Sequence, residues 1–197
     1  MSIKTSFFLI IFFAVLLFAC SKQNTKKIPI ISKEFLKKEN LDSLKKMSFY
    51  NQFNKELDFN SVNKKVSVVN FFFTSCTTIC PIMENNLQEV FKQNEDVHFI
   101  SYTIDPERDS ISVLKEYYKR VAKNATNRTF INGSKKDLKK IAKIYLSSIK
   151  NDDDNYFYHT SSVVLLDKKK RIRGFYDALN KEEIILLNED IQLLLKE

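Results

Sequence analysis

Two nearly continuous apolar runs dominate the hydrophobic pattern in the middle of the chain. They cover residues 66–73 and 97–104, and their β-branched and aromatic composition is typical of strands buried on both faces. Between them, apolar residues recur at helical spacing, at Ile82, Met83, Leu87, Val90 and Phe91. A strand, a helix and a second strand in this order predict a βαβ unit whose strands pair in parallel.

The rest of the pattern predicts further helices and strands on both sides of this unit. They are a helix from about Asp109, as its N-cap, to Val121, a strand over 128–131, a helix capped by Ser134, a hairpin over 162–166 and 172–176, and a final helix over 181–195. A small hairpin over 47–50 and 57–59 is expected at one edge of the sheet. The order resembles a thioredoxin-like domain, an α/β fold in which helices flank a central mixed β-sheet, here with an N-terminal β-hairpin.

The first segment of the chain has the pattern of a secretory signal. Twelve apolar residues at 7–18 follow Lys4, which fits the core of a signal peptide and falls short of the roughly 20 residues that span a bilayer. The run ends in Leu17-Phe18-Ala19-Cys20, which resembles the lipobox of bacterial lipoproteins. We therefore expect residues 1–19 to be a lipoprotein signal peptide and Cys20 to be lipidated, with an uncleaved anchor helix as the alternative. Both interpretations place the rest of the chain outside the cytoplasm and attached to a membrane, at the periplasmic face in a Gram-negative cell.

Charge is distributed unevenly along the chain. The formal net charge is +8, and between Ser21 and Met47 eight lysines face three acidic residues, which leaves only about +2 for the domain that follows. We expect residues 20–47 to be a lipid-anchored basic linker and residues 48–197 to form one domain. The lysines of the linker suit anionic lipid headgroups, although a solvated linker has the same composition. A domain so close to neutral lacks the basic surface that binds nucleic acid, so no nucleic-acid partner is expected.

Two cysteines stand where the first buried strand meets the first helix. In Cys76-Thr77-Thr78-Ile79-Cys80-Pro81 the proline suits the first turn of a helix, and a helix reaching back to Cys76 would place both thiols on one face. A helix N-terminus favours thiolates, and two thiolates favour Cu(I) or zinc over hard cations. His159 is the candidate third ligand, which would complete a trigonal Cu(I) site, whereas zinc usually needs a fourth ligand.

The same residues also allow structural roles. Cys76 and Cys80 are able to form a disulfide in an oxidising compartment, although closing so short a loop stabilises a fold little. His159 is equally well explained as a hydrogen-bonded structural histidine, and His98 and Met83 are more simply explained as structural and core residues. On the residues alone, the ligand set stays open.

Three blocks of sequence occur together in an unusual combination. They are Asn70-Phe71-Phe72-Phe73-Thr74-Ser75-Cys76-Thr77-Thr78-Ile79-Cys80-Pro81, then Thr103-Ile104-Asp105-Pro106-Glu107-Arg108-Asp109, then His159-Thr160-Ser161 with Arg173-Gly174-Phe175-Tyr176. In this order and spacing they resemble the Sco/SenC family, the copper-binding thioredoxin-like proteins that help assemble cytochrome c oxidase. The resemblance implies that Cys76, Cys80 and His159 are copper ligands, for Cu(I) or for Cu(II).

Asp105 is the other candidate site residue. It follows a central strand at the carboxyl end, where open α/β sheets place their sites, and it precedes a proline that biases it towards extended geometry. One interpretation places it beside the metal loop, where it would influence His159 or a docking partner. The other gives it an ion pair with Arg108 while Asp109 caps the next helix.

The leading hypothesis for function is an extracytoplasmic copper chaperone. It would deliver copper to the copper subunit of cytochrome c oxidase, or to another extracytoplasmic copper protein, with the membrane anchor raising its effective concentration near the acceptor. The alternative is an enzyme, a thiol-disulfide reductase that acts on the cysteines of the acceptor with Cys76 as nucleophile and Cys80 as resolving thiol. Because oxidation of the pair would abolish Cu(I) binding, a chaperone also needs a thioredoxin-like reductant. A lipoprotein with vestigial cysteines is the third hypothesis.

Overall fold

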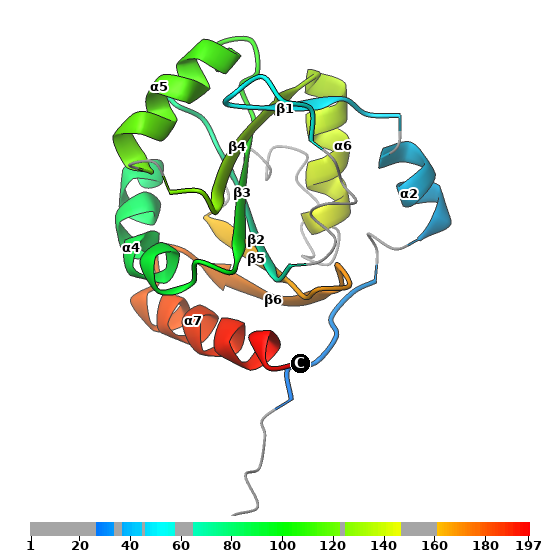
Figure 1. The fold of residues 1–197 in the computed structure, drawn as a ribbon, viewed down its shortest axis with the longest axis vertical. Coiled ribbons are helices and arrows are strands. Elements are labelled where there is room, and N and C mark those ends of the chain that lie inside the picture. Colours follow the sequence, from blue (N-terminus) through cyan, green and yellow to red (C-terminus); the bar gives the residue numbers. More distant parts are fainter. Residues whose placement is uncertain (1–26, 34–36, 45, 58–64, 123–124, 147–160) are drawn as a thin grey trace, which may run out of the picture.

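The computed structural model describes residues 27–33, 37–44, 46–57, 65–122, 125–146 and 161–197. In this part of the chain a six-stranded mixed sheet lies at the centre with helices on both of its faces (Figure 1), which is the predicted architecture. The strands are β1 (Phe49–Asn51), β2 (Ser67–Phe72), β3 (His98–Thr103), β4 (Arg128–Gly133), β5 (Ser162–Leu166) and β6 (Ile172–Asp177). The helices are α2 (Lys38–Leu44), α4 (Ile79–Gln93), α5 (Ile111–Val121), α6 (Lys135–Leu146) and α7 (Lys181–Leu195).

The strand order is β1-β4-β3-β2-β5-β6. Strands β2 and β3 are parallel, as the βαβ pattern predicts, and β4 is parallel to β3, while the other neighbours are antiparallel. Because Phe72 lies opposite Thr103, β2 and β3 finish at the same end of the sheet. The loops that follow them therefore share this end, which we call the thiol end because Cys76 follows β2.

Side chains along the central strands alternate between two cores. Phe71 and Tyr102 face the core that α6 and α2 cover. Val68 and Phe99 face the opposite core, beneath α4 and α7, and Phe72 joins a smaller cluster that α5 completes. Because both faces of β2 and β3 are covered, their sequences lack the polar alternation of a half-exposed strand.

The N-terminal hairpin is present at the edge of the sheet. Strand β1 pairs antiparallel with β4, and the chain then turns back so that Tyr50 and Glu56 form an isolated bridge. The side chain of Asn51 accepts hydrogen bonds from the backbone N–H groups of Phe53 and Lys55 and so stabilises the turn. Positions 58 and 59 of the expected second arm lie outside the described residues.

One helix start agrees with the sequence prediction and another differs from it. Helix α4 begins at Ile79, so Pro81 lies inside the first turn and Cys76 lies in the turn before the helix. The prediction that Asp109 caps α5 is wrong, because Ser110 is the N-cap and its hydroxyl accepts from the N–H of Val113. Both residues have side chains that suit a cap, and the choice between them depends on contacts distant in the sequence.

Part of the stretch expected to be a linker packs against the domain. Ile28 is 5% exposed in the core beneath α7, and Leu44, at the end of α2, is 3% exposed in the core beneath α6. Ser32 pairs with Ile172 beside β6. From residue 27 onwards, the described part of the predicted linker therefore contributes to the fold.

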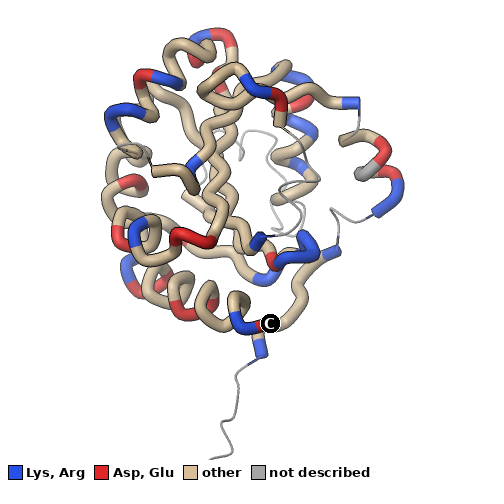
Figure 2. The backbone as a smooth tube through the Cα atoms, viewed as in Figure 1, with Lys and Arg blue, Asp and Glu red and all other residues tan. Residues whose placement is uncertain are grey.

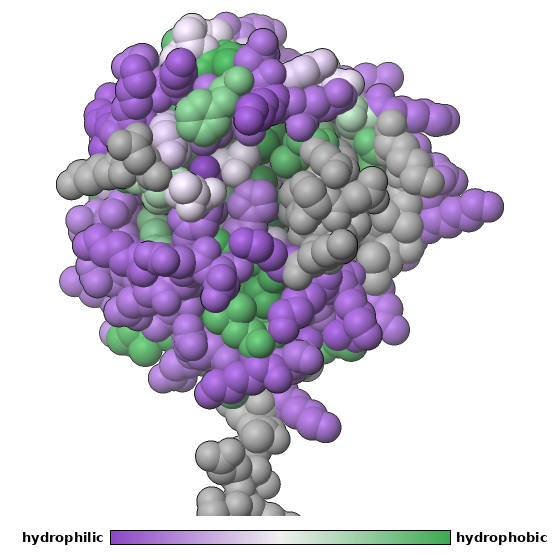
Figure 3. Space-filling view, in the orientation of Figure 1, coloured by the Kyte–Doolittle hydropathy of each residue, from purple (hydrophilic) through white to green (hydrophobic). Residues whose placement is uncertain are grey.

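The surface of the described part is mainly polar. Basic and acidic positions are interspersed over the helices (Figure 2), and the face in Figure 3 is mostly hydrophilic with small, separate hydrophobic areas. Among the described residues, no helix has the length and apolar character needed to cross a bilayer.

Candidate metal centre

The two cysteines meet at the thiol end of the sheet. Cys76 lies in a tight turn, where its N–H donates to the carbonyl of Phe73, and Cys80 lies in the first turn of α4. The N–H of Cys80 donates to the sulfur of Cys76 across 3.4 Å. The Cys76 sulfur thus accepts one of the free N–H groups at the start of α4, a position that favours negative charge. Both cysteines are free thiols, so the structure is that of the reduced pair.

The two thiols differ in exposure and in acidity. Partial burial raises the pKa of the Cys76 thiol, but hydrogen bonds from the Cys80 thiol and from the backbone of Cys80 and Thr78 outweigh this and lower it from 9.0 to about 7. Burial raises the pKa of the Cys80 thiol to about 12, and the neighbouring Cys76 adds to the increase. Near neutral pH the pair therefore carries one thiolate, on the more exposed Cys76, supported by a protonated Cys80 thiol beneath it.

This asymmetry predicts how the pair reacts with an alkylating reagent. We expect the iodoacetamide alkylation rate of the reduced protein to rise with pH around a midpoint of about 7, with the first adduct on Cys76. In Cys80→Ala the thiol that donates to Cys76 is lost, so the midpoint should move upward. Alkylation quenched at successive times, followed by peptide mass spectrometry, measures both effects. Equal rates of modification at Cys76 and Cys80 would contradict this assignment.

Asp109 holds the cysteine loop in place. It is fully buried, and its carboxylate accepts hydrogen bonds from the N–H and the hydroxyl of Thr74 and from the hydroxyl of Thr103, the last at 2.5 Å. The side chain of Asn132 in turn donates to the Asp109 carbonyl. One carboxylate thus joins the loop after β2 to the end of β3. Its contact on the loop, Thr74, is two residues before Cys76. The sequence pattern indicated only a helix cap at Asp109, but the neighbouring Ser110 is itself a good cap and leaves Asp109 free for this other role.

A buried ion pair lies one turn of helix beyond Cys80. The guanidinium of Arg128, whose side chain is 3% exposed, makes two hydrogen bonds of 2.7 Å to the carboxylate of Glu84. The same guanidinium lies 3.9 Å from the centre of the Phe91 ring. Because the Glu84 charge is compensated from within the fold, the carboxylate is stabilised close to the thiols without binding a cation from solvent.

The thiols open onto a groove between α4 and α5. The groove has a volume of about 780 Å³, and its lining includes Cys76, Cys80, Glu84, Tyr117 and Arg120. Cys80 is only 8% exposed, whereas Cys76 is half-buried. An incoming ligand from a partner protein would therefore meet the sulfur of Cys76 first.

The remaining predicted site residues are placed as follows. His159 lies outside the described residues. Strand β5 runs antiparallel to β2, with Leu166 opposite Ser67 and Val164 opposite Val69, so β5 begins at the thiol end. Ser162, three residues after His159 in the sequence, therefore lies at the end of the sheet where the cysteines lie. Among the described residues, no cluster of three or more His, Cys, Asp or Glu side chains suits a metal ion.

Three other candidates have contacts with groups other than the thiols. The carboxylate of Asp105 lies 3.7 Å from the exposed guanidinium of Arg108, as one of the two interpretations predicted. Met83 is buried in the core beneath α4, and His98 hydrogen-bonds Thr129 at the opposite end of β3 from the cysteines. A structural role for Met83 and His98 is thus confirmed, and a role for Asp105 near the metal stays a prediction.

Similarity to known proteins assigns the family. The SCO1/SenC family model matches residues 37–194. The chain belongs to the SCO1/SenC family. The match begins before residue 48, within the stretch that packs against the domain. The family resemblance that the sequence motifs implied is therefore confirmed, and so is the fold class, a mixed sheet flanked by helices that the solved relatives share.

Individual SCO1/SenC relatives agree with this assignment. A crystal structure of a SCO1/SenC family lipoprotein from Bacillus anthracis has 28% identity and a TM-score of 0.64, over 75% of this chain and 92% of that one. BsSco, described as a member of the Sco family of cytochrome c oxidase assembly proteins with a disulfide switch, has 26% identity and a TM-score of 0.59, over 74% and 88%. Bradyrhizobium japonicum ScoI with copper bound, at 19% identity and a TM-score of 0.55 over 75% and 96%, shares the fold.

The sequence match to curated SCO1/SenC relatives is shorter. The SCO1 protein homolog of Bacillus subtilis is 33% identical over 90 residues, which are 44% of this chain and 47% of that protein. The chain thus spans about half the length of the curated relatives that it matches.

Proposed function

We propose that this chain is an extracytoplasmic copper chaperone that holds copper through Cys76, Cys80 and His159 and delivers it to the copper site of cytochrome c oxidase during assembly. The observation that carries the proposal is the pair of adjacent reduced thiols at the thiol end of the sheet, one of which has a pKa of about 7. Two soft sulfur donors favour Cu(I), and copper-bound ScoI from Bradyrhizobium japonicum has the same fold. The β5 register supports His159 as the third ligand.

Copper is the cargo in this proposal, and transfer is a ligand exchange. Cys76 is the more exposed sulfur and the better leaving thiol, because its pKa is the lower of the two. An acceptor ligand would replace Cys76 first while the buried Cys80 still holds the ion. The acceptor is the oxidase copper subunit or another extracytoplasmic copper protein.

The anchor is the second part of the proposal. A signal peptide over residues 1–19 and a lipid on Cys20 would keep the protein at the membrane, where an oxidase is assembled. The SCO1/SenC relative from Bacillus anthracis is described as a lipoprotein, which supports this part. Metabolic labelling with a palmitate analogue, lost in Cys20→Ala, would test it separately from copper.

Copper binding is tested with the reduced protein. We expect one Cu(I) per chain in the wild type, none retained by Cys76→Ser/Cys80→Ser, and weaker retention by His159→Ala, because a trigonal site loses one of its three ligands. Titration against a chromophoric Cu(I) chelator measures stoichiometry and affinity. His98→Ala is the matched control, since this histidine lies at the far end of β3. Equal affinity in the wild type and His159→Ala would remove His159 from the ligand set.

A thiol-disulfide reductase is the second candidate function. Cys76 has the exposure and low pKa of an attacking thiolate, with Cys80 placed to resolve a mixed disulfide. Cys76 would attack an acceptor disulfide and release one acceptor thiolate; Cys80 would then attack Cys76, release the other and leave a Cys76–Cys80 disulfide for a thioredoxin-like reductant to reduce. A stable mixed disulfide between Cys80→Ser and an oxidised acceptor peptide would favour this candidate, and its absence would favour the chaperone.

A further inference from the structure

The chain enters the domain through a short strap, which we define as residues 27–32. Ile28 is buried beneath α7, and the N–H of Ile31 donates to the carbonyl of Ile172 at 2.8 Å. The N–H of Ile172 donates back to the carbonyl of Ser32 at 2.9 Å. These contacts attach the strap to the beginning of β6.

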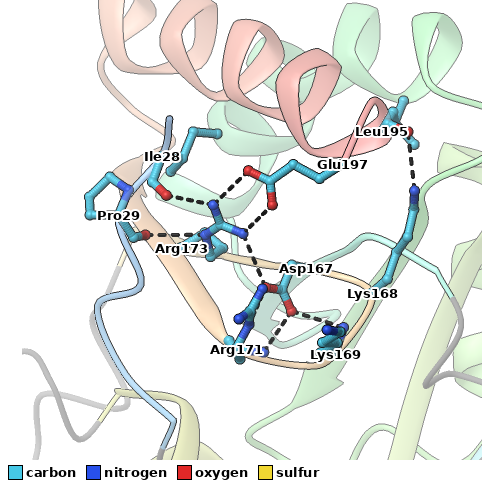
Figure 4. Close-up of polar contacts among 9 residues, drawn as sticks. All are labelled: Ile28, Pro29, Asp167, Lys168, Lys169, Arg171, Arg173, Leu195 and Glu197. Carbon is cyan, nitrogen blue, oxygen red and sulfur yellow. Dashed lines mark hydrogen bonds and ion pairs between the residues drawn. The ribbon is translucent and has the colours of Figure 1, made fainter. Parts of the chain in front are cut away.

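The guanidinium of Arg173 fastens the strap to the rest of the domain (Figure 4). Its donors reach the carbonyls of Ile28 and Pro29, the carboxylate of Asp167 at 3.1 Å, and both oxygens of the Glu197 carboxylate at 2.7 and 2.8 Å. Arg173 is 4% exposed, and its five N–H groups are all engaged. The strap, the β5–β6 turn and the last residue therefore meet at one buried cation.

This meeting point lies at the opposite end of the sheet from the thiols. Leu166, at the end of β5, pairs with Ser67, at the start of β2, and the ammonium of Lys170 in the next turn donates to Lys65 and Ser67. The cysteines follow the other end of β2, beyond Phe72. The strap end and the thiol end are thus separated by at least the length of β2, about 17 Å at about 3.3 Å per residue.

Basic side chains surround the strap end. Exposed lysines at this end are Lys27, Lys65, Lys168, Lys169 and Lys196. Acidic groups at the same end are Glu95 and Asp96 in the turn before β3, together with Asp167 and Glu197, which bind Arg173. Figure 2 shows basic positions around the β5–β6 turn and the C-terminus, where the strap enters. This end therefore has an excess of positive charge, which suits an anionic lipid surface.

The length of the tether limits how the domain stands on a membrane. Seven residues lie between Cys20 and Ile28, and the eight steps from one to the other reach at most about 29 Å when the chain is fully extended. A folded domain of about 150 residues is roughly 40 Å across. The tether is too short for the strap end to point away from the membrane while the thiol end rests on it.

We propose that the strap end of the domain rests on the anionic membrane surface, so that Cys76 and Cys80 face away from it. The proposal rests on the lipidation of Cys20 proposed above. It places the copper exchange roughly 40 Å above the membrane surface, at the top of a domain of this size. The partner would then offer its copper site at that height, on an extramembrane domain.

The test is energy transfer from a dye on the protein to an acceptor dye in the lipid headgroups. The full lipidated chain is reconstituted into phosphatidylcholine vesicles with and without phosphatidylglycerol. One sample carries the dye on Cys76 in Cys80→Ser, and the other on residue 169 in Cys76→Ser/Cys80→Ser/Lys169→Cys. On vesicles with phosphatidylglycerol, energy transfer from the dye at position 169 should be at least about two-fold higher than from the dye on Cys76, because β2 alone separates the two ends of the sheet by about 17 Å. Equal transfer, or higher transfer from Cys76, overturns the proposal.

A charge variant separates the lipid contact from the tether. Lys27→Gln/Lys65→Gln/Lys196→Gln replaces exposed side chains, and circular dichroism and thermal melting verify its fold. Its transfer from position 169 should fall to the value seen on pure phosphatidylcholine; no change would overturn the anionic contact. A chain that does not float with vesicles overturns both the anchor and this orientation, whereas a floating chain with equal transfer overturns the orientation alone.

Discussion

Replacing Asp109 by Ala is expected to lower the free energy of unfolding by about 3 kcal/mol and to weaken Cu(I) binding. The substitution removes a fully buried carboxylate that accepts from the backbone and hydroxyl of Thr74 and from Thr103. Donors left buried without an acceptor cost about 1–3 kcal/mol each, partly offset where water enters. The Thr74 loop would lose its attachment to β3, and Cys76, two residues further on, would no longer be held beside Cys80.

Urea denaturation and a competitive Cu(I) titration measure the two effects of this substitution. Asp109→Asn is nearly isosteric, but its amide places N–H groups against donors, so it should lose a large share of the stability as well. Asp105→Asn is the matched control for the stability measurement, because this carboxylate is partly exposed and its partner Arg108 is 78% exposed. We expect the control to change stability by less than about 1 kcal/mol. Unchanged copper affinity in a folded Asp109→Ala protein would show that Asp109 does not position Cys76.

Replacing Arg128 by Met is expected to destabilise the fold by about 3–5 kcal/mol, because it leaves the mostly buried Glu84 carboxylate without its partner. The lost guanidinium also lies against the Phe91 ring and donates to the Val121 carbonyl, so packing between α4 and α5 weakens too. Because Glu84 lines the groove beside Cys80, the unpaired charge would also raise the pKa of nearby thiols. Thermal and urea unfolding measure the first effect and the pH profile of Cys76 alkylation the second.

The paired variant distinguishes charge from packing at Arg128. Glu84→Gln/Arg128→Met removes both charges and should recover a clear part of the lost stability, since the buried carboxylate is then neutral. Arg108→Met, at an exposed ion pair, should cost less than about 1 kcal/mol. If the double variant were as unstable as Arg128→Met, the loss would come from packing against Phe91 instead of from the Glu84 charge.

The central sheet and its helices were predictable because they depend on local pattern. The apolar runs of β2 and β3 are buried on both faces, and the spacing in α4 marks the face that lies against the sheet. Asp109 was not predictable in the same way. Its sequence neighbourhood is typical of a helix cap, and the contacts that turn it inward come from Thr74, which is 35 residues earlier.

The packing of the strap against the domain was not predictable from the sequence, for a related reason. Residues 21–47 are rich in lysine, and this composition is typical of a solvated linker. The strap is held mainly through its backbone, because the carbonyls of Ile28 and Pro29 accept hydrogen bonds from Arg173, about 145 residues away. The side-chain composition of the strap gives no indication of this contact. At the thiols, spacing predicted the pair, while the difference in their pKa values depends on burial depth and loop geometry.

The Arg173 cluster also has a practical consequence for laboratory work. Because Glu197 and the strap bind the same guanidinium, both ends of the domain are part of one buried cluster. A truncation at residue 48 would remove Ile28 and Pro29 and leave two Arg173 donors unpaired, and an affinity tag placed directly after Glu197 would crowd the same cluster. A soluble version should therefore begin before residue 27 and carry its tag at the N-terminus, far from the thiols.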